Sequence, residues 1–229
     1  MAKTGIIGHR GAAGLALENS HDSMLAALNH EIDGIEFDVR RTKDGRLVVL
    51  HDSHTGRIAK QKVLISYKTL EELQAIKLKN GQHIPSLEEV FELIGDRMTM
   101  VVDIKDSGSA DELLRILNEY PKAKVQFTSL KYGELAKLHK VRPDLPIFVR
   151  DLLNPFEIVH TARRMRAEGI SLNMWLMNPL TYWLAKRRNL EIRIYTVNNA
   201  FMVKFFKKLY PGIVIYTNHP DRFVGKLQG

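Results

Sequence analysis

The strongest constraint on the fold is a regular alternation of short apolar runs with longer amphipathic segments. Eight runs rich in β-branched residues predict strands, and the chain between them is long enough for helical crossovers. The predicted strands are Gly5–Gly8, Gly34–Val39, Met98–Ile104, Lys124–Thr128, Pro146–Val149, Gly169–Leu172, Glu191–Val197 and Gly212–Tyr216. Eight strands alternating with helices in 229 residues predict one α/β domain, a (β/α)₈ barrel over residues 1–229.

Local signals mark where several of the helices begin. Thr69–Glu72, Ser86–Glu89 and Ser109–Glu112 have the spacing of capping boxes, in which a hydroxyl and a carboxylate satisfy each other's backbone amides. Asn154-Pro155 and Asn178-Pro179 place a capping amide before a proline at the first helical position. A doubly wound open sheet is the structural alternative, but no glycine-rich nucleotide loop follows a predicted strand.

A ninth strand-like run, Arg46–His51, interrupts this rhythm. It follows the strand Gly34–Val39 too closely for a helical crossover, so the two runs are predicted to pair as an antiparallel hairpin. Asp44-Gly45 is a strong signal for a two-residue turn, and with that turn the numbers of paired residues sum to 89. Asp38 is then expected directly opposite His51, in a hairpin above the barrel rim after the second barrel strand.

Two carboxylates lie on the second predicted strand. Glu36 and Asp38 are two residues apart and therefore point to the same side, while Ile35, Phe37 and Val39 point to the other. We expect the carboxylates inside the barrel, where unpaired negative charges are costly. A divalent cation is one remedy, and an Arg or Lys partner in a structural ion pair is the other.

Asp103 and Lys105 repeat this spacing on the next parallel strand. Asp103 is placed to complete an all-oxygen site with Glu36 and Asp38, which suits one divalent cation, Mg²⁺ or Ca²⁺. Lys105 also points inward. It is available either to hold a phosphoryl oxygen or to act as a counter-ion to the carboxylates.

His9 and Arg10 follow the first predicted strand and should lie at the same rim as His51. A single histidine at a strand end is more often structural. Two histidines around a metal and a phosphate can divide the work of general base and general acid near neutral pH. The guanidinium of Arg10 offers a planar pair of donors to phosphate oxygens.

The ordered set of these motifs resembles the glycerophosphodiester phosphodiesterase family over nearly the whole chain. The matching motifs are His9-Arg10-Gly11, Glu18-Asn19-Ser20, Asp33-Gly34-Ile35-Glu36-Phe37-Asp38-Val39, Thr42-Lys43-Asp44-Gly45, Val48-Val49-Leu50-His51-Asp52, Asp103-Ile104-Lys105 and Thr217-Asn218-His219-Pro220. The resemblance implies a TIM-type barrel and metal-dependent hydrolysis of glycerophosphodiesters to sn-glycerol 3-phosphate and an alcohol.

By position, the resemblance also implies roles for seven residues. It makes His9 and His51 the acid–base pair, Glu36, Asp38 and Asp103 the metal ligands, and Arg10 and Lys105 the phosphate contacts. Four positions depart from the family pattern: Asp103 stands in place of the usual Glu, Leu17 in place of Pro, Tyr195 where Trp is frequent, and Asn218 in place of Asp. The shorter side chain of Asp103 predicts a water-mediated or weaker metal contact.

Two alternative functions compete with this one. A lysophospholipase D on the same scaffold is the enzymatic alternative, because Leu172-Asn173-Met174-Trp175-Leu176-Met177 offers an apolar rim for an acyl chain. Ordinary packing of strand against helix is the other interpretation of that run. A degenerate, non-catalytic binding module is the alternative of a different class, and the intact histidines and carboxylates argue against it.

Composition narrows the remaining choices. Without cysteine the chain has no disulfide framework, zinc–thiolate site, iron–sulfur cluster or thiol nucleophile. No apolar run approaches 18 residues and no signal peptide is recognisable, so we expect a cytoplasmic protein without an integral membrane segment.

The charge of +8 is unevenly distributed, with a net of −2 in residues 1–110 and +10 in residues 111–229. The basic half suits either weak contact with anionic surfaces or an ordinary solvated surface. No nucleic-acid-binding motif accompanies it, so the expected partner is a small-molecule phosphodiester and not a nucleic acid. The sequence indicates no particular oligomeric state.

Overall fold

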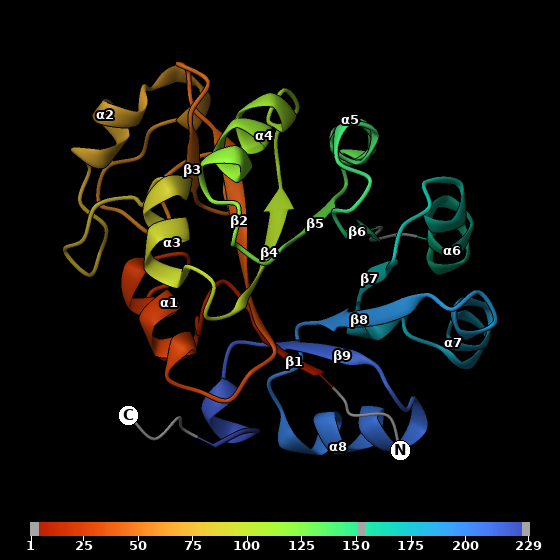
Figure 1. Ribbon diagram of the computed structural model, residues 1–229. Helices are drawn as coiled ribbons and strands as arrows, with labels where there is room; N and C mark the ends of the chain where they lie inside the picture. Colours follow the sequence, from red (N-terminus) through yellow and green to blue (C-terminus); the bar gives the residue numbers. More distant parts are fainter. Residues whose placement is uncertain (1–4, 151–153, 226–229) are drawn as a thin grey trace.

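The computed structural model describes residues 5–150 and 154–225, and within them eight parallel strands close into a barrel (Figure 1). β1 (Gly5–Gly8) is bonded to β2 (Gly34–Arg41) on one side and to β9 (Val214–Thr217) on the other, which closes the ring. The other barrel strands are β4 (Thr99–Ile104), β5 (Val125–Ser129), β6 (Ile147–Arg150), β7 (Gly169–Asn173) and β8 (Glu191–Tyr195). The predicted (β/α)₈ fold is confirmed, although its predicted limits, 1 and 229, lie outside the described residues.

Helices cover the outside of the ring (Figure 1). The crossover helices are α1 (His21–Leu28), α3 (Leu87–Ile94), α4 (Ala110–Glu119), α5 (Tyr132–Val141), α6 (Pro155–Arg164), α7 (Pro179–Lys186) and α8 (Ala200–Leu209). Shorter segments are the helix α2 (Leu70–Gln74) and the 3₁₀ turns η1 (Ile65–Tyr67), η2 (Met174–Leu176) and η3 (Pro220–Arg222). None of the helices within the described residues combines the length and the apolar character needed to cross a bilayer.

Four of the five predicted caps are confirmed, and one is wrong. Side chains that accept hydrogen bonds from first-turn amides are those of Thr69, Ser86, Asn154 and Asn178. Ser109 makes no such bond, because its backbone is already helical. The amide of Ala110 donates instead to Glu134 of α5, at 2.8 Å, so a neighbouring helix supplies the cap. A carboxylate brought by tertiary packing is invisible to a local sequence pattern.

The alternation on β2 places the candidate site as expected. Ile35, Phe37 and Val39 are fully buried in the main apolar cluster between strands and helices. Glu36 and Asp38 point to the other side, the barrel interior, and are at most 2% exposed. The sheet register then sets Asp38 beside Asp103 of β4.

The extra strand β3 (Leu47–Val49) pairs antiparallel with β2, but in a different register from the predicted one. Val39 faces Val49, so paired residue numbers sum to 88 and not 89. Asp38 consequently lies opposite Leu50, whose amide donates to the Asp38 carbonyl at 3.0 Å. His51 follows one residue later, beyond the end of the ladder.

The turn explains the shift. Thr42 and Arg46 close the hairpin through an amide-to-carbonyl bond of 2.9 Å, which leaves three residues in the loop instead of two. Gly45 is the last of these and adopts φ +83°, the left-handed conformation that ends a three-residue hairpin loop. The Asp-Gly pair therefore signalled a hairpin correctly, but not its length.

The chain between β3 and α3 forms a separate small layer beside the hairpin. Its own apolar cluster includes Leu50, Ile58, Ile65, Leu73 and Ile84, each no more than 4% exposed. In Figure 1 this layer, with α2, lies outside the ring next to β3 and α3. It fixes the position of the segment that carries His51.

Candidate active site

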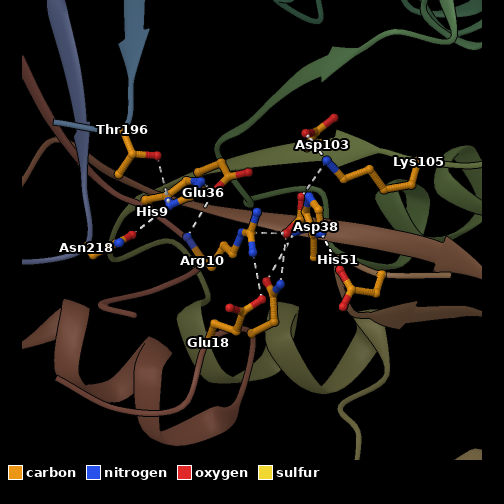
Figure 2. A network of polar contacts seen from close by, with 12 residues as sticks. His9, Arg10, Glu18, Glu36, Asp38, His51, Asp103, Lys105, Thr196 and Asn218 are labelled. Atoms are coloured by element: carbon orange, nitrogen blue, oxygen red, sulfur yellow. Dashed lines mark hydrogen bonds and ion pairs between the residues drawn. The ribbon is translucent and has the colours of Figure 1, made fainter. Parts of the chain in front are cut away.

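A cluster of polar side chains lies at the carboxyl ends of β1, β2 and β4, the end of a (β/α)₈ barrel where active sites are built. Figure 2 shows the two predicted histidines on different sides of the cluster, with Arg10 between them; His9 follows β1 and His51 follows β3. All seven predicted site residues lie in or beside this cluster.

Three buried carboxylates form its centre. One oxygen from each of Glu36, Asp38 and Asp103 lies within 4.8 Å of the others. Each side chain is at most 2% exposed. The spacing rule that selected these residues from the sequence thus brings them together, since alternate residues on adjacent strands share one face.

Three cations lie against this group, and one of them is the Arg10 guanidinium, whose Nε is 3.3 Å from Asp38. The Lys105 ammonium is 2.8 Å from Asp38 and 2.6 Å from Asp103. Arg150, the last residue of β6, pairs with the same oxygen of Asp103 and donates to the Tyr195 hydroxyl at 3.0 Å. The predicted strand ended at residue 149, so the sequence interpretation missed Arg150. The rule applied to β2 and β4, which searches the carboxyl end of each strand, would have found it had the strand been extended by one residue.

Two residues with left-handed backbone conformations donate hydrogen bonds to the carboxylates. Arg10 has φ 51°, and this conformation aims its amide at Glu36, to which it donates at 2.9 Å. Asn19 has φ 55°; its side-chain amide donates to Asp38 at 2.9 Å and its side-chain oxygen accepts from the Asp38 amide at 3.3 Å. Strained conformations of non-glycine residues concentrate where geometry is functionally demanding.

The pKa values of Glu36 and Asp38 are shifted in opposite directions. Burial raises the pKa of Glu36 well above its ordinary value, and the neighbouring Asp38 and Asp103 add to the effect. Burial acts in the same direction on Asp38, but Lys105 and Arg10 outweigh it and leave the pKa of Asp38 below its usual range. Glu36 accordingly favours its neutral form, whereas Asp38 stays ionised beside Lys105 and Arg10.

His9 is held in one orientation. Its Nδ1 lies 2.7 Å from the side-chain oxygen of Asn218 and 3.5 Å from the Thr196 hydroxyl. An amide oxygen only accepts, so Nδ1 carries the proton and Nε2, 3.9 Å from Glu36, offers its lone pair toward the carboxylates. Burial lowers the pKa of His9 to about 4, with a contribution from Arg10, so the ring is neutral near pH 7.

His51 has a charged partner instead. Its Nδ1 lies 2.8 Å from Asp52, and Asp52 accepts a further bond of 2.8 Å from Arg57. Arg57 also donates twice to Glu18, at 2.6 and 2.7 Å, and Glu18 in turn accepts from Arg10 at 2.8 Å. Burial lowers the pKa of His51, while Asp38 and Asp52 act in the opposite direction. This chain of ion pairs connects the two sides of the site, and sequence reasoning did not foresee Arg57.

The carboxylate group fits a divalent cation. Its ligand atoms are all oxygens, which Mg²⁺ and Ca²⁺ prefer, and buried like charges this close need a positive partner. Lys105, Arg10 and Arg150 provide such partners to Asp38 and Asp103. Among the described residues, Glu36 accepts a bond from the backbone amide of Arg10 and lies 3.9 Å from His9, so it is the carboxylate with the weakest positive partner. The ion-pair interpretation is therefore confirmed for Asp38 and Asp103, and the metal-ligand interpretation stays a prediction for all three carboxylates.

Comparison with known sequences agrees with this arrangement. Residues 9–222 match the sequence model of the glycerophosphoryl diester phosphodiesterase family. A glycerophosphodiester phosphodiesterase of Caldanaerobacter subterraneus subsp. tengcongensis is 31% identical, and the match covers 97% of each chain. One of Bacillus altitudinis is 30% identical, over 96% of this chain and 97% of the relative.

Solved structures show the same fold. An Oleispira antarctica phosphodiesterase, determined in complex with the product sn-glycerol-3-phosphate, superposes with a TM-score of 0.88 at 20% identity, over 95% of this chain and 94% of the other. The glycerophosphodiester phosphodiesterase of Thermotoga maritima superposes with a TM-score of 0.83 at 23% identity, over 97% and 98%.

Proposed function

Because this chain belongs to the glycerophosphoryl diester phosphodiesterase family, we propose that it hydrolyses a glycerophosphodiester to sn-glycerol 3-phosphate and an alcohol. The reaction would use one divalent cation, Mg²⁺ or Ca²⁺, and two histidines. The observation that supports the proposal is the convergence of Glu36, Asp38 and Asp103 within 4.8 Å at the rim that also carries His9 and His51.

Glu36, Asp38 and Asp103 would hold the cation. When bound, it would polarise a non-bridging phosphate oxygen and offset the charge that develops as the alcohol leaves. Arg10 and Lys105 lie beside the carboxylates with donors suited to phosphate oxygens, and Arg150 adds a third cation at the same rim.

The two histidines have different partners, and we assign them different roles. His9 presents the lone pair of Nε2, since Asn218 fixes the proton on Nδ1, so His9 takes a proton from the attacking water. The water oxygen bonds to phosphorus as the bond from phosphorus to the alcohol oxygen breaks. His51, whose imidazolium form the Asp52 carboxylate stabilises, gives its proton to that leaving oxygen.

A lysophospholipase D activity is the second candidate. The run Leu172–Met177 is divided: Leu172 and Met177 are buried in the main apolar cluster, as the packing interpretation predicted, whereas Trp175 is 75% exposed. An exposed aromatic at the catalytic rim suits an acyl chain. The exposure of Trp175 favours this second candidate. It does not argue against the first, because an acyl chain would change only the part of the substrate that Trp175 contacts and not the phosphodiester.

One assay separates these functions. We expect release of glycerol 3-phosphate from glycerophosphocholine with added Mg²⁺ or Ca²⁺, and loss of that activity after chelation that only a divalent cation reverses. Faster turnover of lysophosphatidylcholine would identify the second candidate. Full activity after exhaustive chelation would contradict the metal site, and inactivity on both substrates with metal present would indicate a non-catalytic module.

A further inference from the structure

The outer face of α8 carries an apolar stripe. Val203 and Phe206 point inward and are buried against the barrel. Phe201, Phe205 and Leu209 occur at every fourth position on the outside, with exposed fractions of 73%, 44% and 47%. Residues four apart lie one above another on a helix, so these three form a continuous row facing solvent.

Trp175 extends this row. It belongs to η2, which follows β7, and at 75% it is among the most exposed large side chains of the described residues. A shallow groove of about 410 Å³ lies between η2 and α8 and is lined by Trp175, Phe201 and Phe205. Met174 of η2 and Met177, which follows η2, also line it. The aromatic side chains of two separate elements therefore form one surface.

Lysines flank the stripe. Lys204, Lys207 and Lys208 are exposed on α8, and Lys204 and Lys208 form a second row beside the aromatic one. From residue 169 to residue 220 the chain has seven Lys or Arg and a single carboxylate, Glu191. That carboxylate begins β8, at the opposite end of the barrel from the catalytic rim, and pairs with Arg193 at 2.6 Å.

The stripe begins at the catalytic rim. Thr196, which contacts His9, follows β8, and Asn199 caps α8 three residues later. Trp175 is the second residue after the end of β7. Figure 1 shows α8 and α7 on the outside of the ring, beside β9 and β8. The end of the row that carries Trp175 and Phe201 is thus next to the mouth of the proposed active site.

We define the α8 face as Trp175, Phe201, Lys204, Phe205, Lys207, Lys208 and Leu209. We propose that the α8 face binds peripherally to a lipid surface that contains anionic headgroups. The aromatic and aliphatic side chains would enter the boundary between headgroups and acyl chains, and the lysines would contact the phosphates. An apolar helix stripe flanked by Lys is the pattern of helices that lie in this boundary.

The same observations disfavour a protein partner. The core of a protein–protein interface is depleted in charged residues and in lysine above all, whereas here lysines alternate with the aromatic positions along the stripe. A long, flexible ammonium side chain reaches the headgroups while its methylene stem stays with the apolar row. Charge complementarity therefore points to an anionic membrane surface and not to a second protein.

Tryptophan fluorescence provides a direct test, because the chain has two tryptophans, Trp175 and Trp183. The Trp183→Phe variant retains the one that belongs to the α8 face. With vesicles containing phosphatidylglycerol we expect a blue shift of its emission, quenching by brominated acyl chains, and co-sedimentation of the protein. Vesicles of pure phosphatidylcholine should bind at least tenfold more weakly. Unchanged emission with anionic vesicles would overturn the proposal.

Charge-matched variants locate the binding surface. Lys204→Glu with Lys208→Glu, and separately Phe201→Ser with Phe205→Ser, should each weaken vesicle binding at least tenfold while the circular dichroism spectrum stays unchanged. Lys122→Glu with Lys140→Glu makes the same charge change at exposed lysines outside the α8 face and should alter binding less than threefold. Equal loss in this control would show that net charge alone drives binding. Self-association that the Phe variants abolish, without vesicle binding, would identify a second copy as the occupant. Either result would overturn the proposal.

Discussion

The two halves of the barrel rim differ in what they contribute to the site. The first half, from β1 to β4, supplies the three carboxylates, both histidines, Arg10 and Lys105. The second half, from β5 to β9, contributes Arg150, Thr196 and Asn218 among the described residues, each in contact with a side chain of the first half. One half therefore carries the candidate reactive groups, and the other adds contacts to His9 and Asp103.

The reason lies in local sequence spacing. On β2 and β4 a polar residue recurs at every second position near the carboxyl end, so each strand presents two ionisable groups to the interior. The layer between β3 and α3 adds His51 from outside the ring. The described residues of the second half form no such layer, and the outer side chains of α8 are exposed.

The largest expected effect concerns the two histidines. Asn218 of the second half contacts His9, and Asp52 of the first half contacts His51. His9→Ala or His51→Ala should lower kcat by about 10²–10⁴-fold, because each removes one proton transfer. A nitrophenyl phosphodiester has a leaving group that needs no acid. It should rescue His51→Ala and leave His9→Ala inactive. Steady-state kinetics with both substrates checks this, and rescue of His9→Ala instead would reverse the assigned roles.

A smaller effect is expected for the charged partner of His51. Asp52→Asn should lower kcat by about 10–100-fold, since the outer partner of a functional histidine fixes its orientation and favours its cationic form. Asp111→Asn removes a carboxylate on the exterior of α4 and is the control, with kcat expected within twofold of the wild type. An equal kcat for Asp52→Asn and the control would show that His51 needs no oriented partner.

Asp52 should also contribute to the stability of the first half in a way that depends on acid pH. Hydrogen bonds from Arg57, followed by the bond to His51, lower the pKa of Asp52 from 3.8 to about 2. The folded state therefore binds this proton less readily than the unfolded state. The stabilisation is present above pH 4 and is lost as the pH falls toward 2.

Denaturant titrations between pH 6 and pH 3 check this. The difference in unfolding free energy between wild type and Asp52→Asn should shrink as the pH falls. A difference that stays constant over this range would mean that Arg57 does not stabilise the ionised carboxylate.

The first half was also the more predictable from sequence. Glu36, Asp38 and Asp103 followed from a two-residue period on apolar strands, a local pattern that the barrel preserves. His51 was correctly predicted to lie near the site, but from a wrong register. The pair Asp44-Gly45 fits a two-residue turn and also the three-residue loop that the structure has, with Gly45 in its last position.

The contacts that cross between halves could not be predicted in this way. Arg150 meets Asp103, and Asn218 meets His9, only because ring closure brings distant strands together. The cap on α4 from Glu134 has the same origin. Sequence periodicity reports which face a residue occupies on its own element, and it carries no information on which distant partner that face meets.

Asp103 is where the two halves meet, and its substitution should have the smallest effect. The Lys105 ammonium and the Arg150 guanidinium both contact its carboxylate, one from each half. Asp103→Glu lengthens the side chain by one methylene and restores the residue that is usual in the family. We expect the dissociation constant for Mg²⁺ to stay equal or to become tighter by up to about tenfold, since the longer side chain reaches further into the carboxylate group.

Calorimetric titration with Mg²⁺ measures this directly. Asp106→Glu is the matched control, because Asp106 pairs with Arg40 at 2.7 Å, outside the carboxylate group, and its variant should bind the metal within twofold of the wild type. If Asp103→Glu instead loses both metal affinity and activity, the two flanking cations have shaped the site for the shorter side chain. Arg150→Met in the same background then decides between the halves. Recovery of metal affinity would show that Arg150 occupies the space that the longer carboxylate needs, whereas no recovery would assign the constraint to Lys105 and the first half.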